Sequence, residues 1–104
     1  MAGVALLFAA LGDPTRLALL HRLSHGGPAS ISELADRVSM TRQGVTKHLH
    51  VLADAGVIAG AREGREHVWT LNPERFAEAR RTLDTIARRW EDALGGLKAH
   101  IEKA

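Results

Sequence analysis

The sequence contains no cysteine among its 104 residues. It therefore has no disulfide framework, no zinc ribbon, no thiol nucleophile and no thiolate metal sensor. It also lacks a Gly-rich phosphate-binding loop and the strand-turn-helix elbow that presents a nucleophilic serine, so no motif indicates an enzyme. No internal repeat, linker or low-complexity segment divides the chain, and its length is typical of one domain, which we assign to residues 1–104.

The sequence also lacks an apolar run long enough to cross a membrane. Its most apolar stretch, residues 3–11, is too short and follows no basic segment, so it predicts neither a membrane anchor nor a signal peptide. We expect a helix of the mature fold there, in a cytoplasmic protein with no membrane partner.

Neither sign of charge dominates the sequence. Lys and Arg number 14 and Asp and Glu 12, a formal net charge of +2, and the sequence pI is about 9.7. Many soluble domains have this balance, so it indicates a nucleic-acid partner only weakly, and the positions of the cations matter more.

Helix-start and helix-stop signals predict two helices in the first quarter of the chain. Residues 3–11 are apolar nearly all round, which a helix tolerates only when more than one face is buried. In a small domain this usually requires a partner chain. A second helix begins at the N-cap Asp13, with Pro14 in its first position, and ends at residues 24–28.

Two short helices joined by a tight turn are predicted over residues 30–55, which is a helix-turn-helix. Ser30 and Glu33 fit a capping box at the start of the first helix, and Thr41 can cap the second. Gly44 falls inside the second helix, where glycine costs about 1 kcal/mol relative to alanine. A close approach, by the preceding helix or by DNA, would explain this glycine.

A hairpin and a long helix complete the chain. Residues 57–71 read as two strands joined at Gly64, which supplies the positive φ of the turn, and such a hairpin is the wing of a winged helix. Asn72 can cap the last helix, over residues 73–102. The sequence thus predicts a mainly α-helical fold with a small β-hairpin, in the order helix, helix, helix, helix, strand, strand, helix.

The first and last helices are expected to hold a homodimer. Apolar residues recur every seven positions along the last helix over about four heptads, and such a seam requires another helix beside it. The interface residues expected from the two helices are Val4, Leu7, Phe8, Leu11, Phe76, Leu83, Ile86, Trp90, Leu94, Leu97 and Ile101.

Four segments stand out together: Ala10-Leu11-Gly12-Asp13-Pro14-Thr15-Arg16, Ile31-Ser32-Glu33-Leu34-Ala35, Val45-Thr46-Lys47-His48-Leu49 and Leu52-Ala53-Asp54-Ala55-Gly56-Val57-Ile58. In this order and spacing they resemble the ArsR/SmtB family of bacterial winged-helix transcriptional repressors, over nearly the whole chain. The resemblance implies a homodimer that binds a palindromic operator in double-stranded DNA and that a metal ion or another signal releases. Thiol-sensing members carry a cysteine pair where this chain has residues 33–37, so it resembles a member without the cysteine metal-sensing motif.

The second helix of the helix-turn-helix turns its apolar positions to the core and its polar side chains outward. Arg42 suits guanine, Gln43 suits adenine, and Thr46 can contact a phosphate or a thymine methyl group. His48 is expected to pack rather than read bases. We expect DNA contacts here from Thr41, Arg42, Gln43, Thr46, Lys47 and His50. The alternative interpretation is a solvated polar helix face.

Further DNA contacts are expected outside this helix. Arg62 and Arg65 lie at the wing, where neighbouring glutamates dilute the positive field. Thr15 and Arg16, at the start of the second helix, can anchor a phosphate through helix amides and the side chain. Simple capping plus a surface arginine is the alternative there.

Two other functions stay open. His21 and His25 are four residues apart on one helix, a spacing that lets two imidazoles share an ion, but two ligands do not make a site and the helix dipole already explains His25. We expect no metal and no cofactor, and keep a His-based metal-responsive repressor as an alternative. The other alternative is a winged-helix protein-interaction module, which would be expected to carry apolar residues where this chain has Arg42 and Lys47. An unidentified small-molecule inducer stays a candidate partner.

Overall fold

The computed structural model describes residues 2–103, and within that range the chain forms five helices and a small sheet. The expected order of elements is confirmed, apart from one additional strand. The elements are α1 (Ala2–Leu11), α2 (Pro14–Gly26), β1 (Ala29–Ser30), α3 (Ile31–Val38), α4 (Arg42–Asp54), β2 (Ile58–Glu63), β3 (Glu66–Leu71) and α5 (Pro73–Lys103).

The additional strand, β1, makes the sheet three-stranded, with the antiparallel order β1-β3-β2. The sequence predicts only the β2–β3 hairpin, whose turn has Gly64 at φ 63° as expected. β1 pairs Ala29 with Trp69 and Ser30 with Val68. Two residues are too few to show the alternation of a strand, and they directly precede α3. β1 ties the base of the wing to the connection between α2 and α3.

The core lies among helices α1 to α4 and the base of the sheet. Trp69 of β3 belongs to it and is 5% exposed. Its fully buried large side chains are Leu7, Leu19, Leu34, Val45, Leu49, Leu52 and Val57. Both helices of the helix-turn-helix contribute to this cluster. The buried residues of α4 lie on one of its faces, so apolar packing holds that helix along this face only.

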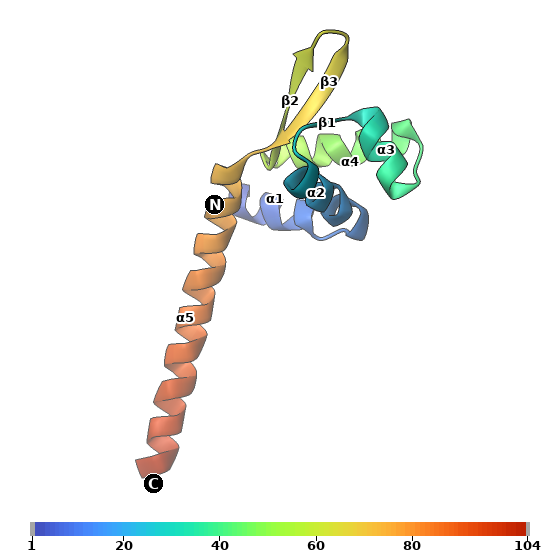
Figure 1. Ribbon diagram of the computed structural model, residues 1–104. Helices are drawn as coiled ribbons and strands as arrows, with labels where there is room; N and C mark the ends of the chain where they lie inside the picture. The colour runs from blue at the N-terminus through green and yellow to red at the C-terminus, as the bar shows by residue number, and fades with distance from the viewer. Residues whose placement is uncertain (1, 104) are drawn as a thin grey trace.

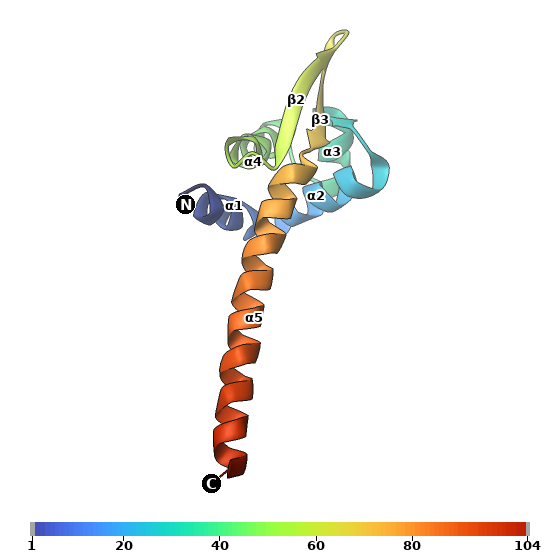
Figure 2. The same ribbon diagram turned by 90° about the vertical axis from the view of Figure 1, so that its left-hand side faces the viewer.

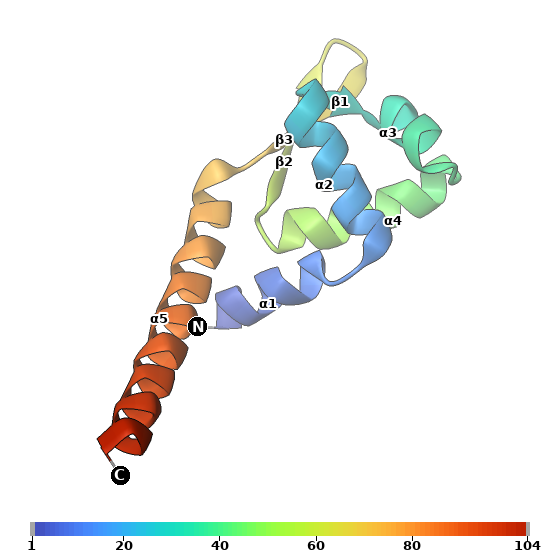
Figure 3. The same ribbon diagram turned by 60° about the horizontal axis from the view of Figure 1, so that its bottom comes forward.

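α1 differs from the sequence expectation at one position. Leu7 is expected at the dimer interface, but it is wholly buried inside its own protomer, so this assignment is wrong. The reason is that α1 packs on both α4 and α5 of the same chain, as Figure 3 shows. Val4, Phe8 and Leu11 stay half-buried, and Leu6 is 49% exposed.

No single helix among residues 2–103 is long and apolar enough to cross a membrane. Residues of α1 and α2 reach that length and apolarity only as a pair, with a bend of 93° between them. α1 is a helix that packs within the fold, as the sequence predicts for residues 3–11.

α5 extends far beyond the rest of the molecule (Figures 1 and 2). The chain measures 69 × 24 × 23 Å and its radius of gyration is 18.5 Å, whereas a compact domain of this length has about 13 Å. Every described residue from position 83 onward is exposed. The projecting part carries the expected heptad seam, and its large apolar side chains are 48–64% exposed: Leu83, Ile86, Trp90, Leu94, Leu97 and Ile101.

Side-chain caps start three of the helices as the sequence predicts. The Asp13 carboxylate accepts a hydrogen bond from the Arg16 backbone N–H at 3.0 Å, and Thr41 Oγ1 accepts one from Gly44 N–H at 3.0 Å. Asn72 behaves differently, because its Nδ2 donates to the Gly56 carbonyl at 3.0 Å instead of capping α5.

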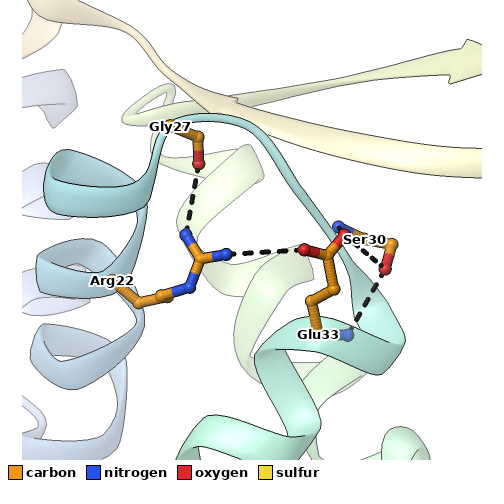
Figure 4. A network of polar contacts seen from close by, with 4 residues as sticks. All are labelled: Arg22, Gly27, Ser30 and Glu33. Atoms are coloured by element: carbon orange, nitrogen blue, oxygen red, sulfur yellow. Dashed lines mark hydrogen bonds and ion pairs between the residues drawn. The ribbon is translucent and has the colours of Figure 1, made fainter.

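The cap of α3 is a complete capping box that is also tied to α2 (Figure 4). Ser30 Oγ accepts from the Glu33 backbone N–H at 3.3 Å, and the Ser30 N–H donates to Glu33 Oε1 at 3.2 Å. Arg22 of α2 donates to Glu33 Oε2 and to the Gly27 carbonyl, both at 3.5 Å. The start of the helix-turn-helix is therefore fixed by both local and tertiary polar contacts.

We predict that Ser30→Ala lowers the free energy of unfolding by about 1 kcal/mol, because it removes the cap of α3 and leaves the Glu33 N–H without its acceptor. Ser32→Ala is the matched control, since Ser32 is an exposed serine two residues later, in the first turn of α3. Urea unfolding followed by circular dichroism measures both. Equal midpoints for the two variants would show that the capping box contributes nothing to stability.

Candidate nucleic-acid interface

α4 has one apolar buried face and one polar exposed face. Val45, Leu49 and Leu52 are fully buried against the core. The exposed side chains at or just before its start and along its outer side include Thr41, Arg42, Gln43, Lys47 and His50. These are five of the six residues of α4 and its N-cap that the sequence predicts to contact DNA, and all five are exposed.

Thr46, the sixth predicted residue, is half-buried, and its Oγ1 donates to the Arg42 carbonyl at 2.7 Å. A hydroxyl has one proton to donate, so this contact leaves Thr46 without a donor for a phosphate. Contact with a thymine methyl group remains open to it. Thr41 Oγ1 only accepts a hydrogen bond in its cap, so its proton is available to a phosphate.

Gly44 lies against side chains of the connection that precedes α4. A Cβ at this position would lie 2.9 Å from Met40 Cε and 3.2 Å from Thr41 Oγ1. Both are side-chain atoms, so the connection before α4 approaches Gly44 closely without backbone contact.

Arg42 of α4 and Arg65 of the wing line the same hollow, which has a volume of about 210 Å³. The hydroxyl-bearing Ser32, at the start of α3, lies on its wall. The complete lining is Ser30, Ile31, Ser32, Arg42, Arg65, Glu66 and His67. Two arginines and two serines against one carboxylate suit an anion such as a DNA phosphate. Arg62 is exposed on β2, outside this lining.

The wing contains a packed ring pair that the sequence analysis does not single out. The His67 and Trp69 rings stack, with centroids 4.5 Å apart and an interplanar angle of 16°. His67 also covers Gly60 of the neighbouring strand, where a Cβ would lie 2.2 Å from its Nε2. A glycine inside a strand signals such a close approach, so Gly60 is the clue in the sequence.

The half-buried Arg16, for which the sequence predicts a phosphate contact, is bound to groups of its own protomer. Its Nε donates to the Ala10 carbonyl at 2.6 Å and its Nη2 to the Ala9 carbonyl at 3.3 Å, while Nη1 lies 3.3 Å from His48 Nδ1. Both carbonyls belong to the last turn of α1, which carries no basic residue of its own. Arg16 therefore caps the end of α1 and touches α4, which is a structural role. Its phosphate contact stays a prediction, because a guanidinium has five donors and these contacts use three of them.

Asp13 lies beside this arginine and carries a shifted pKa. The hydrogen bond from the Arg16 backbone N–H holds the pKa of the Asp13 carboxyl below its usual range, and the charge of Arg16 acts in the same direction. Half-buried Thr15 contributes its backbone N–H. His48 Nδ1 is 3.9 Å from the Asp13 carboxylate and is half-buried, in agreement with its expected packing role.

The histidine pair on α2 has an ordinary local explanation. His25 Nδ1 is 2.8 Å from the His21 carbonyl, and the two ring centroids are 6.3 Å apart. Within residues 2–103, no group of three or more His, Asp or Glu side chains comes together in a way that could hold a metal ion.

The comparison with known proteins agrees with this geometry. A family described as a helix-turn-helix domain matches residues 11–61. The HTH-type transcriptional regulator Rv2034 of Mycobacterium tuberculosis is 39% identical over 93 residues, which are 89% of this chain and 83% of that protein.

Two solved structures identify the family more closely. An ArsR-like transcriptional regulator from Rhodococcus sp. RHA1 superposes with a TM-score of 0.82 at 34% identity, over 93% of this chain and 91% of that one. The crystal structure of an ArsR family transcriptional regulator superposes with a TM-score of 0.78 at 38% identity, over 86% of this chain and 92% of that one. The chain belongs to the ArsR family. It is a DNA-binding transcriptional regulator with a winged helix-turn-helix fold and not an enzyme, and the resemblance seen in its motifs is confirmed.

Within this ArsR-family fold, Arg75 is an interior residue that the sequence analysis does not identify. Its guanidinium contacts carbonyls 20 and 72 residues away in sequence. No local pattern signals partners at such separations, so only the folded structure reveals them.

We predict that Arg16→Ala lowers the free energy of unfolding by about 1–2 kcal/mol, because two carbonyls at the end of α1 lose a charged donor. Arg37→Ala is the control, an exposed arginine in the last turn of α3. Thermal and urea unfolding measure both. Unchanged stability with weakened DNA binding would restore the phosphate contact that the sequence predicts for Arg16.

Proposed function

We propose that this ArsR-family regulator is a cytoplasmic homodimeric repressor that binds a palindromic operator with one α4 in each half-site. The observation that carries the proposal is the polar exposed face of α4, which bears Arg42, Gln43 and Lys47 and is backed by three fully buried apolar residues. A helix held in this way can enter a major groove without giving up core packing.

Base and backbone contacts are divided between two surfaces in this proposal. Gln43, exposed in the first turn of α4, reads a base edge, because its amide can bond adenine at two points. Arg42, which by residue type suits guanine, is assigned here to a phosphate that it holds with Arg65 in the hollow they share. Arg62, Lys47 and Thr41 make further backbone contacts. His50 and Thr46 contact the DNA beside Gln43, and Thr15 completes the set at the start of α2.

The homodimer in this proposal is formed by the exposed seam of α5 together with α1. Six large apolar side chains of α5 are about half or more exposed in the protomer, and large contiguous apolar patches mark interaction sites. Half-buried Val4, Phe8, Leu11 and Phe76 extend the seam toward the body of the protomer. A two-fold dimer then presents two copies of α4 to successive major grooves, about 34–36 Å apart.

A salt series of fluorescence anisotropy measurements tests the proposal, with the DNA upstream of the encoding gene and a scrambled duplex of equal length. Tight binding of two protomers to the native duplex alone supports it. Equal binding to both duplexes, lost steeply with salt, means that only phosphate contacts are made. An absence of binding at low salt favours a protein-interaction module. Addition of candidate small molecules to the bound complex then tests for an inducer.

We predict that Gln43→Ala weakens binding to the native duplex by about 1–3 kcal/mol and leaves binding to the scrambled duplex unchanged, because it removes a base contact. Lys47→Ala is the companion variant on the same exposed face, and it weakens binding to both duplexes alike because it removes a phosphate contact. Anisotropy titrations at fixed salt measure both. An equal loss of affinity for the native and scrambled duplexes in Gln43→Ala would show that Gln43 does not read a base.

We also predict that Leu83→Glu combined with Trp90→Glu gives monomers, because each dimer would bury four carboxylates in an apolar seam. Arg81→Glu combined with Arg88→Glu is the control, since both arginines are exposed and lie off the heptad seam. Sedimentation equilibrium measures the mass of each. A double seam variant that remains dimeric would place the interface elsewhere.

A further inference from the structure

Arg75, in the first turn of α5, joins three helices through its guanidinium. Its Nε donates to the Ala55 carbonyl at 2.7 Å, its Nη2 donates to the Gly3 carbonyl, and its Nη1 pairs with Glu78. Ala55 is the C-cap of α4, Gly3 lies in the first turn of α1, and Glu78 is on α5 itself. The Arg75 side chain is only 17% exposed.

The surrounding backbone leaves room for this side chain at two glycines. A Cβ at Gly3 would lie 3.2 Å from Arg75 Nη2, and a Cβ at Gly56 would lie 3.3 Å from Arg75 Nε. Gly56 also has φ 81°, a conformation that other residues rarely adopt. The guanidinium thus fits a space bounded by α1, the end of α4 and α5.

The contact with Ala55 satisfies the C-terminal end of α4. The last carbonyls of a helix have no partner within it, and a cation there is favoured by the helix dipole. α4 has no basic residue in its own last turn, so Arg75 of α5 supplies that charge. The five donors of a guanidinium form a rigid fork that spans two carbonyls, whereas a lysine offers all its donors from a single nitrogen.

Arg75 therefore joins the DNA-reading helix to both helices of the proposed dimer interface. Within residues 2–103, α4 and α5 share no extensive packing of their own, whereas α1 packs on both, as Figure 3 shows. Asn72 holds the loop after α4 to the start of α5 through the Gly56 carbonyl. Arg75 adds the α1 contact, so it bears on the angle between α4 and the dimer helices.

We propose that Arg75 is a positioning residue for operator recognition, which fixes the spacing of the two α4 helices in the dimer without touching DNA. This inference rests on the proposed function, because it requires a dimer that reads two half-sites. Without the Arg75 contacts, each α4 could still bind its own half-site. The dimer would lose the gain in affinity that comes from binding both half-sites at a fixed separation.

The first test measures the distance between the two α4 helices directly. The chain has no cysteine, so Lys47→Cys adds a single label site on the exposed face of α4, and a dimer carries two nitroxides. Double electron–electron resonance of the free protein should give one narrow distance distribution. We expect Arg75→Lys to widen it at least about twofold, and Arg81→Ala, an exposed arginine on the same helix, to leave it unchanged.

The second test compares a palindromic duplex, selected by the wild-type protein from a random library, with a duplex carrying one half-site. We expect Arg75→Lys to lose about tenfold in affinity on the palindrome and less than twofold on the half-site. Arg75→Ala repeats the comparison where its circular dichroism matches the wild type. A role in stability alone would weaken both duplexes equally.

The outcomes separate the inference from the proposed function on which it rests. A wild-type protein with no distance between labels, or one that selects no two-fold symmetric duplex, overturns the homodimeric reader and this inference with it. A dimeric wild type with a symmetric operator, whose Arg75→Lys variant keeps the wild-type distance distribution and both affinities, overturns the positioning role alone.

Discussion

The burial of one face of α4 is the constraint on which the rest of the structure depends. Val45, Leu49 and Leu52 are fully buried, and burying one such side chain contributes about 1.5–3 kcal/mol. Because these residues recur at helical spacing, the opposite face is turned to solvent, and that face carries the polar side chains. The caps at Ser30 and Thr41 then determine where the two helices of the motif begin.

Features encoded by neighbouring residues were predictable from the sequence. The N-caps Asp13, Ser30 and Thr41 act within three residues of themselves, and Gly64 turns the hairpin at its own position. These short-range signals predicted the order of the helices and the hairpin. The helical spacing of the apolar residues of α4 predicted which of its faces is polar.

Features that depend on distant partners were not predictable in the same way. The Arg75 guanidinium meets a carbonyl 72 residues away, and Leu7 is buried in a fold where α1 packs on α2, α4 and α5. β1 is too short to have a period, and Asn72 exchanges a local cap for the Gly56 carbonyl. Among the candidate DNA contacts, the sequence identified outward positions but not the pairing of Arg42 with Arg65 around one hollow.

Arginine serves two different purposes in this chain. Arg16 and Arg75 direct their guanidinium groups to the C-terminal carbonyls of α1 and α4, two helices that have no basic residue in their last turn. Their charges stabilise the carbonyl ends of these two helices. The weakly positive net charge therefore says little about the candidate nucleic-acid interface, whose proposed cations are a few residues on α4 and the wing.

The two tryptophans occupy opposite environments in the protomer. Trp69 is 5% exposed and stacked on His67, whereas Trp90 is 64% exposed on the seam of α5. Indole emission moves to shorter wavelength when water is removed from around the ring, so covering the seam alters the light from Trp90 while Trp69 stays constant. The chain therefore contains its own optical probe of self-association, with an internal reference in the wing, and needs no added dye.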